Sequence, residues 1–68
     1  MNTYELVIKN TLTQEVVEVQ TLERFSLERA MEILQEEARS QSDLEAFILF
    51  DGEGRWLAVI SEGVFIKR

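Results

Sequence analysis

The chain has 68 residues, of which 46% are hydrophobic and 29% are charged, a composition typical of one small globular domain rather than of a disordered segment. It contains no cysteine and no histidine, which excludes disulfides and thiol chemistry and leaves zinc only an unusual all-oxygen site. Thirteen acidic residues against seven basic ones give a net charge of −6, which argues against binding to a nucleic-acid backbone and favours a partner with a basic surface.

The chain shows no pattern of a membrane or secreted protein. Its longest uninterrupted apolar runs, such as Ala46 to Phe50, are far shorter than the roughly 20 residues that span a bilayer. The N-terminus lacks the basic and apolar segments of a signal peptide. We therefore expect a cytoplasmic protein. Small domains without disulfides or metals often gain stability by oligomerising or by binding a partner.

Two alternating segments open the chain and predict a β-hairpin. They run from Thr3 to Lys9 and from Gln14 to Gln20, with turn residues between them. The residues expected to face the core are Tyr4, Leu6, Ile8, Val17 and Val19. We expect Val7 and Val16 to point the other way.

An amphipathic helix is predicted next. Ser26 is a suitable N-cap because its hydroxyl can accept a hydrogen bond from an unpaired amide of the first turn. Apolar residues then recur at the helical period and form one stripe. These residues are Leu27, Ala30, Met31, Leu34 and Ala38. The helix is expected to end within residues 40–43, where side chains that compete for backbone hydrogen bonds accumulate.

The segment from Leu44 to Ile60 predicts a second hairpin, since two apolar runs flank the turn residues Asp51 to Gly54. Both runs are apolar at odd and even positions, which predicts a central place in the sheet. The acidic residues of the turn also match the start of a calcium loop, with Glu62 at its twelfth position. The hairpin interpretation is preferred because apolar strand residues fill that loop. Val64 to Lys67 predicts a short last strand.

These elements predict a single α+β domain over residues 1–68, in the order β-β-α-β-β-(β). We expect one helix packed on an antiparallel sheet of four to five strands. One helix covers only one face, so both strands of the second hairpin must send apolar side chains away from it. The residues expected to do so are Phe47 and Leu49 in the first strand and either Leu57 and Val59 or Trp56 and Ile60 in the second.

Such an exposed apolar patch usually marks an interface. The sequence therefore predicts that the face away from the helix binds a partner protein or a second copy of the chain. The alternative is a strongly coiled sheet whose last strand covers part of that face.

The predicted helix offers a second candidate surface. Glu28, Glu32 and Glu36 recur at i, i+4 spacing and form an acidic stripe that could engage a basic protein. The alternative is a solvated helix face, in which Arg29 and Arg39 relieve the repulsion between the carboxylates.

Catalytic residues are not evident. Without histidine, the commonest general base and metal ligand is missing, and the serines lie in predicted caps and turns without a base partner. We therefore expect no enzymatic activity, no cofactor and no metal.

Three segments carry a resemblance to a known class of proteins: TYELVIK at the start, FSLERAMEIL at the helix and GRWLAVISEGVFIK at the end. With the chain length and acidic balance, they resemble small phage-encoded inhibitors of the anti-CRISPR kind over most of the chain, as a pattern without a diagnostic motif. The resemblance implies a non-catalytic protein that sterically blocks a CRISPR-Cas effector, a basic nucleic-acid-handling complex. The alternative is a homodimeric structural or regulatory protein that associates through the helix-free face of its sheet.

Overall fold

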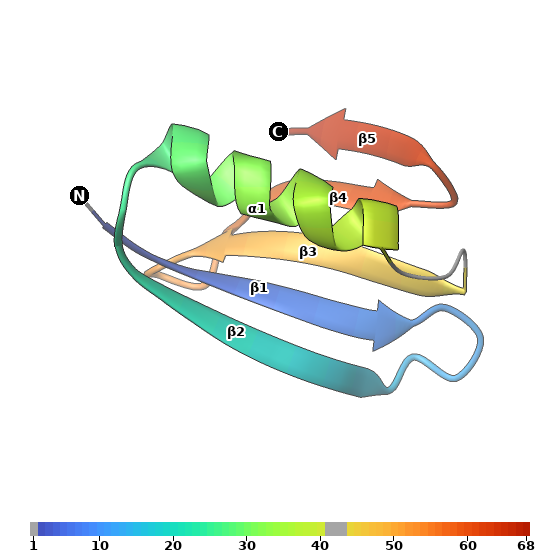
Figure 1. Ribbon diagram of the computed structural model, residues 1–68. Coiled ribbons are helices and arrows are strands. Elements are labelled where there is room, and N and C mark those ends of the chain that lie inside the picture. The colour runs from blue at the N-terminus through green and yellow to red at the C-terminus, as the bar shows by residue number, and fades with distance from the viewer. Residues whose placement is uncertain (1, 41–43) are drawn as a thin grey trace.

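The computed structural model describes residues 2–40 and 44–68, which form a five-stranded antiparallel sheet with a helix on one face (Figure 1). The elements are β1 (Asn2–Asn10), β2 (Val16–Phe25), α1 (Leu27–Ser40), β3 (Glu45–Asp51), β4 (Trp56–Ser61) and β5 (Val64–Lys67). The predicted α+β class and element order are confirmed.

The strand order across the sheet is β2-β1-β3-β4-β5, so β2 and β5 are the two edges. Helix α1 carries the chain from the edge strand β2 back over the sheet to β3, which pairs with β1. The two-residue turn between β4 and β5 places Glu62 and Gly63 at positive φ angles of 53° and 76°, the conformation that suits the twist of a tight hairpin.

Strand β2 differs from the prediction in length and in facing. It continues to Phe25, and its register sets Val19 opposite Val7 on the face away from α1. Gln20 faces the helix, since its amide donates a hydrogen bond of 3.1 Å to Glu37 of α1. Val17 and Val19 are 57% and 51% exposed, so the prediction that they lie against the helix is wrong. The buried anchor of β2 is Leu22, beyond the predicted end of the strand.

Helix α1 begins as predicted. The Ser26 hydroxyl accepts a hydrogen bond of 3.1 Å from the backbone amide of Arg29, which is the N-cap interaction. Ala30 and Leu34 are fully buried against the sheet, whereas Leu27 is 42% exposed. The helix ends at Ser40, and residues 41–43, where its end was also predicted, lie outside the described residues.

The two apolar sets of β3 have the opposite facing to the predicted one. Phe47 and Leu49 are 2% and 0% exposed and belong to the core beneath α1. The prediction that they point away from the helix is therefore wrong. Their neighbours Ile48 and Phe50 point away instead. Both sets are apolar, so the pattern alone cannot decide which one the helix covers.

Strand β4 contains a β-bulge. Trp56 lies opposite Phe50, and Ala58 lies opposite the residue that precedes Phe50 in β3. Leu57 is therefore an extra residue in β4, and such a bulge interrupts the alternation of side chains between the two faces.

The bulge changes which side chains of β4 reach the helix-free face. Leu57 and Ile60 pack against the core on the helix side. Trp56 and Val59, opposite the outward Phe50 and Ile48, point away from the helix. The sequence predicted that Leu57 with Val59, or Trp56 with Ile60, would point away. Both pairings are wrong, because one member of each pair faces the helix.

Candidate protein-interaction surface

A row of β-branched side chains crosses the whole helix-free face of the sheet. Each member lies opposite the next in the strand register, so the row runs directly across the strands from one edge to the other. The members, from β2 to β5, are Val19, Val7, Ile48, Val59 and Ile66. We call this set the valine–isoleucine row. Its end members, Val19 and Ile66, are 51% and 52% exposed.

Two further register rows flank the valine–isoleucine row on this face. The aromatic row consists of Thr21, Glu5, Phe50 and Trp56. The small row consists of Val16, Lys9, Ala46, Ser61 and Val64. On β1 the aromatic row has an acid and the small row has a base. On β3 and β4 the aromatic row has a large ring and the small row has a small side chain.

A shallow apolar depression of 280 Å³ lies at the centre of this face, lined by Ile48, Phe50, Trp56 and Val59. The guanidinium of Arg68 lies 5.7 Å from the centroid of the Trp56 ring, within the range of a cation–π contact. Sequence reasoning assigned Val7 and Val16 to this face, together with either Val59 or, in the alternative pairing, Trp56. It missed Ile48 and Phe50, since nothing in the alternation of β3 separates the two apolar sets.

The other predicted sheet residues lie elsewhere. Phe47 and Leu49 are core residues, and Leu57 is half-buried on the helix side of the bulge. A partner on the helix-free face would therefore contact Val59 but not these three side chains.

The predicted acidic stripe lies on α1, on the opposite side of the molecule. The Arg29 guanidinium forms ion pairs with Glu32 at 3.2 Å and with Glu36 at 3.4 Å, all on exposed side chains. The hydrogen bond to Glu32, followed by the charge of Glu36, raises the pKa of Arg29. Two of the three carboxylates thus share a cation within the chain, which leaves Glu28 as the more available acid. Binding of the stripe to a basic surface stays a prediction.

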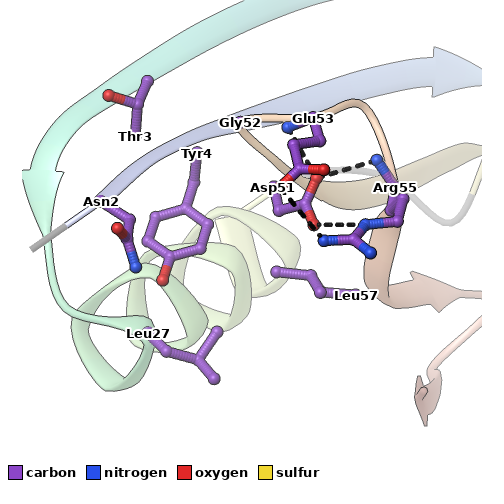
Figure 2. Close-up of a pocket in the computed structure, with 9 residues that line it drawn as sticks. All are labelled: Asn2, Thr3, Tyr4, Leu27, Asp51, Gly52, Glu53, Arg55 and Leu57. Carbon is purple, nitrogen blue, oxygen red and sulfur yellow. Dashed lines mark hydrogen bonds and ion pairs between the residues drawn. The ribbon is translucent and has the colours of Figure 1, made fainter.

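A cleft of 370 Å³ opens where the start of β1, the start of α1 and the β3–β4 turn meet (Figure 2). Its polar wall is Asp51, whose carboxylate accepts hydrogen bonds from the backbone amides of Glu53 at 2.8 Å and Arg55 at 2.9 Å. The Arg55 Nε donates a third bond, of 3.1 Å. The backbone bond from Arg55, foremost among these contacts, lowers the pKa of Asp51.

These bonds commit the Asp51 carboxylate to holding a hairpin turn, which confirms the turn interpretation of Asp51 to Gly54. Within residues 2–40 and 44–68, no group of three or more His, Cys, Asp or Glu residues is placed to hold a metal ion. The Asp51 carboxylate that lines this cleft is therefore already engaged in holding the turn.

Replacing Asp51 tests this role of the turn. An acid whose pKa is lowered in the folded state stabilises the fold above its unfolded pKa, and that contribution is lost as the pH falls through the folded pKa. We expect Asp51→Asn to have a lower urea midpoint than the wild type at neutral pH, with the difference shrinking below about pH 4. The matched control is Glu53→Gln in the same turn, which should shift the midpoint less. A difference that stays constant into acid would contradict this role.

In comparisons with known proteins, no family model, curated protein or solved structure matches this chain. The resemblance to anti-CRISPR inhibitors therefore stays a prediction. In the described part of the chain, no helix has the length and apolar character needed to cross a membrane.

Proposed function

We propose that this chain is a non-catalytic protein-interaction module whose binding surface is the helix-free face of its sheet. The observation that supports the proposal is the valine–isoleucine row, which places five β-branched side chains in register across all the strands. Single exposed apolar residues are normal on protein surfaces, but a continuous apolar patch usually marks an interface.

The shape of this face favours a macromolecular partner over a small ligand. Its depression at Ile48 and Phe50 is shallow, whereas small molecules bind in concave sites that bury most of their surface. A broad sheet face with apolar side chains instead packs well against another sheet, at a spacing of about 10 Å.

A second proposal is that the partner is a CRISPR-Cas effector, which the chain would block sterically. It is supported by the resemblance of the three sequence segments and by the net charge of −6, which favours a basic protein surface. In this proposal the exposed Glu28 of α1 would contribute to the contact.

The test compares immobilised wild-type chain with Ile48→Glu. Ile48 is half-buried and points away from the helix, so a glutamate there keeps contact with water and should cost the strand on the order of 1 kcal/mol. We expect proteins retained by the wild type, further copies of the chain included, to be retained at least about tenfold less by Ile48→Glu. Circular dichroism must show that the variant is folded.

The matched control is Glu32→Gln on α1, which should retain the same proteins as the wild type. The proposal fails if folded Ile48→Glu retains them equally, or if the wild type retains nothing, itself included. Loss of binding in Glu32→Gln alone would also overturn it and would assign the contact to the acidic helix.

A further inference from the structure

We infer that the partner of the helix-free face is a second copy of this chain, bound face to face about a two-fold axis that runs along the valine–isoleucine row. The inference rests on the proposed function and adds the identity and orientation of the partner. Two features carry it: the charges that flank the row and the side-chain sizes that flank it. Under this two-fold rotation, the charges of one copy meet opposite charges of the other, and the large side chains of one copy meet small ones of the other.

A two-fold axis along the row reverses the strand direction of the second copy. The two valine–isoleucine rows then stack on each other, and the aromatic row of each copy lies over the small row of the other. Such an arrangement gives an isologous interface, in which every contact occurs twice. The strands of the two sheets stay within about 30° of alignment, as in other packed sheets.

The first complementarity is one of charge. Glu5 and Lys9 flank Val7 on β1, one in the aromatic row and one in the small row. They lie about 13 Å apart along the strand, too far to pair within one chain. Within residues 2–40 and 44–68, neither side chain forms an ion pair. The rotation brings Glu5 of each copy over Lys9 of the other, and so creates two equal ion pairs.

The second complementarity is one of size. Phe50 of β3 lies over Ala46 of β3 in the second copy, and Trp56 of β4 lies over Ser61 of its β4. Large rings therefore meet small side chains at both strands, which lets the two sheets approach without voids or clashes. On each separate chain Phe50 is half-buried and Trp56 remains 37% exposed.

The alternative two-fold axis, parallel to the strands, lacks both features. It would stack the aromatic rows of the two copies on each other and set Glu5 over Trp56. Lys9 would meet Ser61, so both charges would be buried without partners, which is costly. The side-chain distribution of the face therefore selects the axis along the row.

The overall acidic charge is also compatible with this dimer. Glu28, Glu32 and Glu36 lie on α1, on the far side of the sheet from the interface. In the dimer the two helices are separated by both sheets, a distance greater than the Debye length of about 10 Å at 0.1 M salt. Repulsion between the two acidic stripes is therefore screened.

Charge reversal tests the arrangement on the purified full chain. Sedimentation velocity should show a wild-type dimer. Glu5→Lys should weaken dimerisation about tenfold or more, because the introduced lysine of each copy then faces Lys9 of the other. Lys9→Glu should weaken it similarly, because Glu5 of each copy then faces the introduced glutamate of the other. An equimolar mixture of the two variants pairs lysines with glutamates and should recover the wild-type dissociation constant within about threefold. The double variant Glu5→Lys with Lys9→Glu should recover it as well.

The results separate this inference from the proposed function. Single variants that dimerise as tightly as the wild type, or a mixture that stays weak, overturn the face-to-face geometry. Self-association is overturned if the wild type is monomeric. The proposed function still stands in that case if the wild type retains other proteins that Ile48→Glu does not retain. A dimer insensitive to both the charge reversals and Ile48→Glu overturns both proposals, and is the result expected for pairing through the edge strand β2.

Discussion

Phe47→Glu is expected to abolish folding. Phe47 is 2% exposed in the core beneath α1, and among residues 2–40 and 44–68 no polar or charged residue is buried there to pair with a carboxylate. Loss of a buried aromatic side chain costs about 3–5 kcal/mol, and an unpaired buried charge costs several more. A domain of this length has a total stability of about 3–10 kcal/mol. Circular dichroism and the dispersion of amide proton signals in NMR spectra should show an unfolded chain.

The control for this change is its immediate neighbour. Ile48→Glu introduces the same side chain one residue later on the same strand, but on the opposite face of the sheet. It should remain folded while losing association. A folded Phe47→Glu with native signal dispersion would contradict the core position of Phe47 and would favour the facing that the sequence first predicted for β3.

The elements that could be predicted from sequence are those in which polar and apolar positions differ clearly. In β1, Tyr4, Leu6 and Ile8 alternate with polar or half-buried residues, and all three lie in the core as predicted. In α1 the apolar stripe and the Ser26 cap together determine the helix start and its buried side. The local sequence pattern is sufficient to predict the buried side wherever only one face of an element is apolar.

The facing of β2, β3 and β4 could not be predicted, because in each of these strands the alternation of side chains does not single out one apolar face. Strand β3 is apolar on both faces, so the choice between Phe47 and Ile48 for the core depends on where α1 docks, which is a tertiary property. In β4 the bulge at Leu57 reverses the alternation partway along the strand, and no glycine or proline marks it. In β2 valines occur at both odd and even positions, and the true anchor, Leu22, follows the most regular part of the pattern.

The candidate surface shows how these errors combine. A single amphipathic helix can cover only one face of a sheet, so the sequence correctly predicted that the other face lacks a helix. The residues on that side depend on three strand facings at once, so Val7 and Val16 were assigned to it correctly, whereas Val59 was predicted only as one of two alternatives for β4. The in-register valine–isoleucine row becomes evident only when the strand order is known, since it joins residues from β2 and β5 that are far apart in sequence.

Leu34→Ala is expected to remove a large part of the stability of the domain. Leu34 is 0% exposed at the interface of α1 with the sheet, and truncation of such a leucine leaves a cavity that costs about 2–5 kcal/mol. The total available is about 3–10 kcal/mol, so the urea midpoint should fall steeply. Because dimerisation adds apparent stability, the measurement belongs in an Ile48→Glu background at one protein concentration.

Leu27→Ala is the matched control, since it makes the same substitution at the start of the same helix. Leu27 is 42% exposed and has little buried surface to lose, so its cost should be about 1 kcal/mol or less. The intrinsic preference of alanine for helix favours both variants equally and cancels in the comparison. Equal losses at the two positions would contradict the docking of α1 through Ala30 and Leu34, and with it the distinction between the covered and the helix-free faces on which the proposed interface depends.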